Sequence, residues 1–157
     1  MKKLLPLLLL LCACATTVPA NRTPAAVDRM LDEWHRAAAT ANETAYFGAM
    51  APEFVFLGTD ATERWDLAAF RSFAHPYFAK GKAWTFVPRE RHIIFSPDGT
   101  TAWFDEKLDS ASYGECRGSG VVRNIGGTWK IAHYNLTIPI PNDLAKSVVE
   151  MIRGSKK

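Results

Sequence analysis

A histidine and an asparagine lie two residues apart near the end of residues 128–138, a segment with the periodicity of a β-strand. Alternation along a strand places Trp129, Ile131, His133 and Asn135 on one face. An imidazole titrates near neutral pH, so His133 could move a proton on a bound molecule, and Asn135 could hold its carbonyl or hydroxyl group. The alternative is structural, with both side chains satisfied by neighbouring groups.

A carboxylate in residues 101–110 is the second candidate for proton transfer. Phe104, Glu106 and Leu108 share one face of this predicted strand, and the two apolar residues favour the inner, concave side of a sheet. Apolar surroundings disfavour the charged form of an acid, which could tune Glu106 as a base. Arg117 in the next predicted strand could instead pair with Glu106, and the pair would then be structural.

Several other kinds of site lack their sequence pattern. The four histidines are scattered, and the chain has no His-Glu-x-x-His and no Cys-x-x-Cys motif, so we expect no metal site and no cofactor. Gly118 and Gly120 lie within a predicted strand, where glycine permits sheet curvature. Cys116 in the same strand is predicted to be a buried thiol, and His35 and His92 to be exposed or satisfied at the edge of the core.

The charge of the chain argues against nucleic acid as a partner. The 157 residues contain 19 Lys and Arg against 16 Asp and Glu, which gives a formal net charge of +3. Two of the positive charges belong to Lys2 and Lys3 in a segment that we expect to be removed. The rest of the chain is nearly neutral and lacks the basic patch of a nucleic-acid-binding protein. Its length suits one domain.

The N-terminal sequence has the pattern of an export signal. Two lysines precede the apolar run from Leu4 to Leu11, which is too short to span a membrane. The motif Leu11-Cys12-Ala13-Cys14 resembles the bacterial lipobox. This resemblance implies removal of residues 1–13, diacylation of Cys14 and a tether over residues 14–22. The implied location is the bacterial cell envelope, with a lipid anchor on the outer side of the inner membrane or in the outer membrane. The alternative is an ordinary cleaved signal and a soluble product.

The elements that must position these residues follow from periodicity and from capping and turn residues. Thr23-Pro24, Asn42 and Asp66 are good helix starts, and Pro76 is expected to kink the third helix near His75. The predicted helices cover about 24–40, 43–50, 67–80 and 143–153, and the predicted strands cover 54–57, 84–95, 101–110, 113–124 and 128–138. This order predicts an α+β domain over residues 23–153, with helices on one face of a curved antiparallel sheet and a tail at 154–157.

Three short sequence motifs resemble those of a known family. Phe54-Val55-Phe56-Leu57-Gly58-Thr59-Asp60, Glu63-Arg64-Trp65 and Gly127-Thr128-Trp129-Lys130-Ile131-Ala132-His133 are similar to the SnoaL-like branch of the nuclear-transport-factor-2-like superfamily, over about Val27 to Pro139. The resemblance implies a cone-shaped, cystatin-like fold with a pocket at its wide end. Members include polyketide cyclases, isomerases and dehydratases, as well as proteins that only bind ligands or associate, so the fold alone does not decide the chemistry.

The resemblance leads to three functional hypotheses. The favoured one is a lipid-anchored domain that binds a small apolar or aromatic molecule, because no residue matches the paired acid and tyrosine of the isomerase relatives. The second is a cyclase, isomerase or dehydratase that uses His133 or Glu106, and the third is a homodimer formed through the open sheet face. The residues expected to line the pocket are Trp65, His75, Tyr77, Phe104, Arg117, Trp129 and Asn135.

Overall fold

The first two helices of the chain begin at the predicted capping residues. The computed structural model describes residues 22–155, so the predicted signal segment, Cys14 and most of the tether lie outside the described residues. Helix α1 (Pro24–Ala39) begins at the N-cap Thr23, and the shorter α2 (Glu43–Gly48) begins after Asn42, whose side chain accepts a hydrogen bond from the Ala45 amide. Both caps satisfy amide groups that the first turn of a helix leaves unpaired.

A six-stranded sheet forms the rest of the core, in the order β2-β1-β6-β5-β4-β3. Its strands are β1 (Met50–Leu57), β2 (Arg64–Asp66), β3 (Val87–Phe95), β4 (Thr101–Ser110), β5 (Gly114–Ile125) and β6 (Thr128–Thr137). The predicted antiparallel meander is present in β3 to β6. The sheet as a whole is mixed, because β1 lies parallel to β6. Strand β2 was predicted as loop and pairs through Trp65 with Phe56 of β1.

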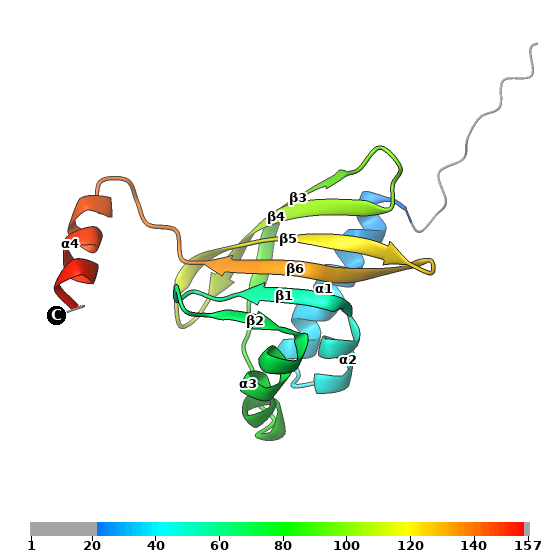
Figure 1. Cartoon of the computed structure of the whole chain (residues 1–157), viewed down its shortest axis with the longest axis horizontal. Helices are drawn as coiled ribbons and strands as arrows, with labels where there is room; N and C mark the ends of the chain where they lie inside the picture. Colours follow the sequence, from blue (N-terminus) through cyan, green and yellow to red (C-terminus); the bar gives the residue numbers. More distant parts are fainter. Residues whose placement is uncertain (1–21, 156–157) are drawn as a thin grey trace, which may run out of the picture.

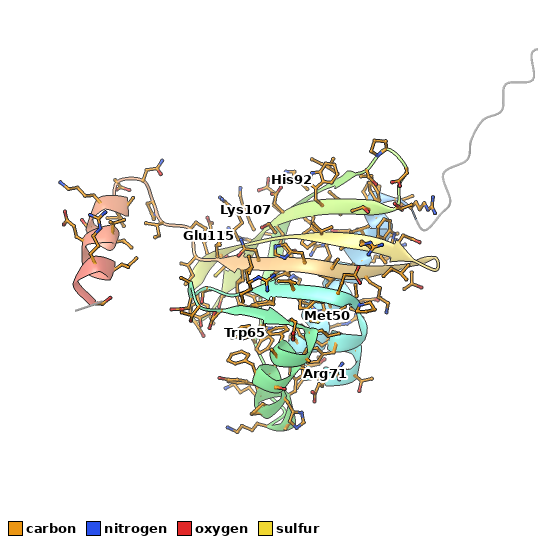
Figure 2. The ribbon with its side chains drawn as sticks, in the orientation of Figure 1. Met50, Trp65, Arg71, His92, Lys107 and Glu115 are labelled. Carbon is orange, nitrogen blue, oxygen red and sulfur yellow. The ribbon has the colours of Figure 1, made fainter. Side chains whose placement is uncertain are left out.

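The first three helices cover one face of this sheet, which confirms the predicted α+β class (Figure 1). Helix α3 (Leu67–Ala79) is capped by Asp66 and continues through Pro76, and it packs on β1 and β2. Val27, Leu31 and Trp34 of α1 are buried in the core, as the apolar stripe predicted. The opposite face of the sheet carries exposed side chains, among them His92, Lys107 and Glu115 (Figure 2).

A β-bulge reverses the side-chain alternation of β6. Val121 of β5 pairs with His133, but Val122 pairs with Ile131, so Ala132 has no partner of its own. One extra residue in a strand moves the following side chains to the opposite face. Tyr134 is therefore buried beside the helices, whereas His133 lies on the outer face.

The bulge overturns the expectation that His133 and Asn135 share the inner face with Trp129 and Ile131. Trp129 and Ile131 precede the extra residue and are buried as predicted. His133 and Asn135 follow it and are half-buried on the opposite side of the sheet.

Helix α4 (Ala145–Ser155) stands apart from this core. It begins two residues later than predicted, and none of its residues is buried. Figure 1 shows it beyond the end of β6, away from the sheet and from the other helices. Among residues 22–155, no helix has the length and apolar character needed to cross a membrane.

Candidate functional site

Glu106 is the most deeply buried acid of the described residues. Strand alternation directs it inward with Phe104 and Leu108, and its exposed fraction is 0%. The predicted orientation of this side chain is therefore confirmed. Gly118 lies opposite Glu106 on β5, where the absence of a side chain leaves room for the carboxylate and its partners.

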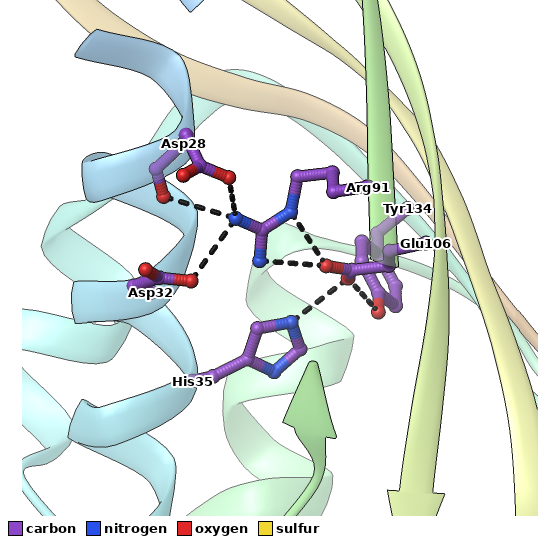
Figure 3. A network of polar contacts seen from close by, with 6 residues as sticks. All are labelled: Asp28, Asp32, His35, Arg91, Glu106 and Tyr134. Atoms are coloured by element: carbon purple, nitrogen blue, oxygen red, sulfur yellow. Dashed lines mark hydrogen bonds and ion pairs between the residues drawn. The ribbon is translucent and has the colours of Figure 1, made fainter. Parts of the chain in front are cut away.

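Three side chains surround the Glu106 carboxylate (Figure 3). The Tyr134 hydroxyl donates a hydrogen bond to Oε1 at 2.7 Å, and Nε2 of His35 is hydrogen-bonded to the same oxygen at 2.8 Å. Arg91 Nε donates to Oε2 at 2.8 Å, and Arg91 Nη2 lies 2.8 Å from that oxygen as an ion pair. Both carboxylate oxygens are thus occupied by donors.

Arg91 connects this buried acid to the first helix. Its Nη1 donates to the backbone carbonyl of Asp28 at 3.1 Å, to the side chain of Asp28, and to Asp32 Oδ1 at 3.0 Å. The Arg91 side chain is only 5% exposed, so these contacts fasten β3 and β4 to α1 in an environment of low dielectric. Arg91, rather than Arg117, is the cation that pairs with Glu106.

The predicted Glu106–Arg117 pair is absent because of strand register. Arg117 lies opposite Lys107 on β5, and its neighbour Gly118 lies opposite Glu106. Alternation therefore directs Arg117 to the exposed face of the sheet, away from the buried carboxylate.

The surroundings keep Glu106 ionised and Tyr134 protonated. Burial by itself would raise the pKa of Glu106, but the hydrogen bond and charge of His35, the charge of Arg91 and the hydrogen bond of Tyr134 lower it below the ordinary value. Burial, and then the nearby Glu106 charge, raise the pKa of Tyr134 well above its ordinary value. The sequence predicted a base tuned by apolar surroundings, whereas this carboxylate is stabilised as an anion and has no free oxygen for a ligand.

A cavity of about 520 Å³ lies on the other side of Tyr134. Its walls are largely aromatic, with side chains from α1, α2, α3, β1, β2, β6 and the segment between α3 and β3. The aromatic residues that line it are Trp34, Tyr46, Phe56, Trp65, Phe70, Phe73, Tyr77, Trp84, Phe86, Tyr113 and Tyr134.

The rings in this cavity wall pack against one another. Trp65 stacks on Phe73 with ring centroids 4.5 Å apart, and Phe56 stacks on Phe70 at 4.3 Å. Offset stacking and edge contacts of this kind stabilise aromatic clusters and hold the rings in place. Tyr46 lies deep in the wall, and burial raises the pKa of its hydroxyl.

The mouth of the cavity lies at the end of the sheet where β1 and β6 finish. Gly58 and Thr59 after β1, Leu136 of β6, and Ser112 and Tyr113 of the β4–β5 turn all line the cavity at this end. Because β4, β5 and β6 are antiparallel, the β4–β5 turn and the C-terminal end of β6 share one edge.

The structure divides the predicted site residues other than Glu106 into three groups. Trp65 and Tyr77 line the cavity. Phe104 and Trp129 are buried in the core outside its lining, with Trp129 packed edge-on against Phe95. The remaining residues lie on the surface or on the outer sheet face; they are His75, Arg117, His133 and Asn135.

Two of these surface placements have a direct cause. His75 projects from α3 into solvent, where its Nδ1 lies 3.0 Å from Glu43 Oε2. His133 is separated from the cavity by the sheet itself, so it cannot act on a molecule held there.

Sequence reasoning missed His35, Arg91 and Tyr134, although Glu106 was found. Cys116 is buried as predicted, and burial raises the pKa of its thiol. No group of three or more His, Cys, Asp or Glu residues within residues 22–155 is arranged to hold a metal ion.

Comparison with known proteins identifies the family of this chain. The sequence profile of the SnoaL-like domain matches residues 27–141. The chain belongs to the SnoaL-like family. No curated protein matches it.

Solved structures share the SnoaL-like fold at low sequence identity. An NTF2-like protein of unknown function from Pseudomonas putida KT2440 superposes with a TM-score of 0.63 at 12% identity, covering 76% of this chain and 88% of that one. An NTF2-like protein from Cytophaga hutchinsonii gives 0.60 at 13% identity, covering 73% and 97%. A protein with a cystatin-like fold from Nostoc punctiforme gives 0.58 at 10% identity, covering 72% and 88%.

Other similar structures are provisionally named for different activities. They include an aromatic ring hydroxylase from Novosphingobium aromaticivorans, a dehydratase from Streptomyces avermitilis and a ketosteroid isomerase from Parabacteroides distasonis. Their identities to this chain are 18%, 13% and 16%, so the likeness extends to the fold only.

Proposed function

We propose that this SnoaL-like domain binds a small, mainly apolar or aromatic molecule in its aromatic cavity. The observation that carries the proposal is a cavity of about 520 Å³ whose wall contains eleven aromatic side chains. Ligand sites in proteins commonly have volumes of roughly 300–1,000 Å³ and mostly apolar walls with a few polar groups. A planar ring would stack on Trp65 or Phe73 and leave polar substituents near the serine and threonine hydroxyls of the mouth.

The polar network behind the wall favours binding over proton transfer. Glu106 has both oxygens engaged by donors, and Tyr134, which lines the cavity, directs its proton to Glu106. Neither group is a free base. The network instead holds the Tyr134 ring at the cavity wall, which suits a preorganised binding surface.

A direct test compares two tryptophans on opposite sides of the sheet. Trp65 lines the cavity, whereas Trp103 is 46% exposed on the outer face. We expect Trp65→Ala to weaken binding of 2-naphthol, measured by fluorescence titration, about tenfold or more, since a stacked aromatic contact and its buried area contribute more than about 1.4 kcal/mol. Trp103→Ala should leave the dissociation constant within about twofold. Equal effects of the two substitutions, or no saturable binding to the unmodified protein, would remove the proposal.

Proton-transfer catalysis of the cyclase, isomerase or dehydratase type is a second candidate, because the chain of hydrogen bonds from His35 through Glu106 to Tyr134 ends at the cavity. In this mechanism Tyr134, rather than His133, would contact the reacting molecule. Turnover of a ketone or enol with a bell-shaped pH–rate profile that Tyr134→Phe abolishes would establish catalysis. Binding without turnover would exclude it for the compounds tested.

We also propose that the domain is exported and anchored to a bacterial membrane through diacylated Cys14. Support comes from the lysines and apolar run at the N-terminus and from the Leu11-Cys12-Ala13-Cys14 motif. Cys14→Ala should move the protein from the membrane fraction to the soluble fraction of its host, and the intact mass of the unmodified protein should include the acyl chains. A membrane fraction unchanged by the substitution would contradict the anchor.

Self-association through the outer sheet face is a further candidate. Ile94 and Trp103 are 55% and 46% exposed there, on neighbouring strands, and together they form an apolar patch. Sedimentation velocity should give a dimer that Trp103→Asp converts to a monomer. A monomer at all concentrations would rule out this interface.

A further inference from the structure

Helix α4 has an apolar face that contacts no other element of the described chain closely enough to bury any residue of the helix. Leu144, Val148, Met151 and Ile152 recur at helical spacing, and the Val148 amide donates to the Leu144 carbonyl, so helical bonding includes Leu144. Leu144, Met151 and Ile152 are 51%, 65% and 48% exposed. A helix of this length is marginal in water on its own and gains stability mainly from packing of its apolar face.

A second exposed apolar surface lies at the mouth of the cavity. Phe73, Tyr77 and Tyr113 line the cavity and are 41%, 47% and 51% exposed. They come from α3 and from the β4–β5 turn, so they surround the opening from two sides. An apolar rim of this kind is typical of a surface that another element covers.

The connection to α4 begins at this mouth. Leu136 of β6 lines the cavity, and the strand ends one residue later at Thr137. Residues 138–144 join the strand to α4 and include Pro139 and Pro141, which keep the connection out of helix. The helix is thus tethered beside the opening, as its position beyond the end of β6 in Figure 1 indicates.

The tether is long enough for the helix to return. The six residues before Leu144 span at most roughly 21 Å when extended, and an α-helix of eleven residues is about 16 Å long. A sphere with the cavity's volume of 520 Å³ is about 10 Å across. One face of α4 can therefore cover the opening without any change in the sheet.

We propose that α4 is a lid helix whose apolar face closes on Phe73, Tyr77 and Tyr113 over the mouth of the cavity. This inference rests on the proposed binding function, because it assigns the helix control over entry to and escape from that same cavity. Closure buries two apolar surfaces that are otherwise in water, and it places Val148 and Met151 over the bound molecule. Lys146, Glu150 and Arg153 on the other face remain in solvent.

The kinetic test uses adjacent residues on two faces of the helix. Val148→Glu puts a charge in the apolar face, and Ser147→Glu puts the same charge outside it. Stopped-flow fluorescence should show 2-naphthol leaving Val148→Glu at least tenfold faster than the unmodified protein, with Ser147→Glu within about twofold. Equal dissociation rates in all three proteins would overturn the lid while leaving binding intact, whereas absence of 2-naphthol binding would defeat the proposed function itself.

A cross-link tests the docked position without any ligand. In a full-length chain with Cys12 and Cys14 replaced by serine, we expect Tyr77→Cys with Met151→Cys to form a disulfide within one chain on mild oxidation. The control pair, Tyr77→Cys with Lys146→Cys, places the second thiol on the polar face and should form it much more slowly. A disulfide between two chains would assign α4 to a second copy and overturn the proposal, as would equal rates for the two pairs.

Discussion

Substituting alanine for Gly118 tests the contact on which the buried network depends. A Cβ at residue 118 would lie 2.2 Å from the Tyr134 hydroxyl oxygen and 2.8 Å from Glu106 Oε1. Both separations are too short for a carbon and an oxygen that are not bonded. The tyrosine hydroxyl must therefore move away, and its 2.7 Å hydrogen bond to Glu106 must lengthen or break.

The expected cost follows from these two effects. Forcing an extra methyl group into a packed core costs about 1–3 kcal/mol, and a hydrogen bond to a charged group contributes about 1.5–3 kcal/mol. Alanine in a strand interior recovers roughly 0.5–1 kcal/mol relative to glycine. Gly118→Ala should therefore lower the free energy of unfolding by about 2–5 kcal/mol, which corresponds to a fall in Tm of roughly 10 °C for a domain of this size.

Guanidinium unfolding followed by circular dichroism measures this change, and Gly48→Ala is the matched control. Gly48 is the last residue of α2, and a Cβ there would meet nothing within 4 Å. Its substitution should change the stability by less than about 1 kcal/mol, with a small gain as the expected sign. If Gly118→Ala were no more harmful than Gly48→Ala, the contact described between Gly118, Tyr134 and Glu106 would be refuted.

A double-mutant cycle isolates the tyrosine hydroxyl. Tyr134→Phe removes the atom that the Gly118→Ala methyl group would strike first, so the double variant should be more stable than the sum of the single effects by about 1 kcal/mol or more. Strict additivity would show that the hydroxyl is not the group that Gly118 accommodates.

Three further predictions concern the core. Glu106→Gln should lower the free energy of unfolding at pH 7 by about 3–5 kcal/mol in urea titrations, because it leaves the buried Arg91 without its main counter-charge. The folded protein lowers the pKa of Glu106, so the stabilisation from this carboxylate is present above the unfolded pKa of about 4.3 and is lost as pH falls through the folded value. The unmodified protein should therefore lose more stability between pH 5 and pH 3 than Glu106→Gln does. Parallel losses in the two proteins would contradict this. Cys116 should react with Ellman's reagent only as fast as the protein unfolds, because its thiol is buried and its pKa raised; rapid labelling of the native protein would contradict this. Deleting Ala132 should leave thermal unfolding cooperative and Tyr134 turned inward, because it removes the one residue without a partner and leaves the pairs on either side in a regular ladder; loss of cooperative unfolding would contradict the assignment of Ala132 as the extra residue.

Local chemistry was enough to predict most of the fold. Thr23, Asn42 and Asp66 each cap a helix through a side-chain oxygen, and that contact needs only residues three positions away. The inward orientation of Glu106 followed from regular alternation along β4, which has no irregularity at that point in its pairing with β5. These signals depend only on residues close together in the chain, so they can be recognised from the sequence alone.

The bulge at Ala132 could not be predicted from alternation alone, because it exists only in the pairing of β6 with β5. The apolar residues nevertheless change phase along the strand. Trp129 and Ile131 fit one alternation, whereas Tyr134 and Leu136 fit the other. This phase change predicts Tyr134 in the core and His133 on the outer face.

The partners of Glu106 depend on elements far apart in the sequence. His35 is 71 residues from Glu106 and Arg91 is 15, and which cation reaches a buried acid is decided by helix packing and strand register. One signal was available for His35, since it lies four residues after Leu31 on the buried stripe of α1. A polar residue on an apolar stripe needs a buried partner, and Glu106 was the only acid expected inside.

The most direct test of the central claim is to locate an aromatic ligand in the protein by nuclear Overhauser effects. At saturating 2-naphthol, we expect contacts from the ligand ring protons to the indole of Trp65 and to the ring of Tyr77, with none to Trp103. Contacts confined to the outer sheet face, or no contacts from a saturated complex to Trp65 and Tyr77, would contradict the assignment of the aromatic cavity as the binding site.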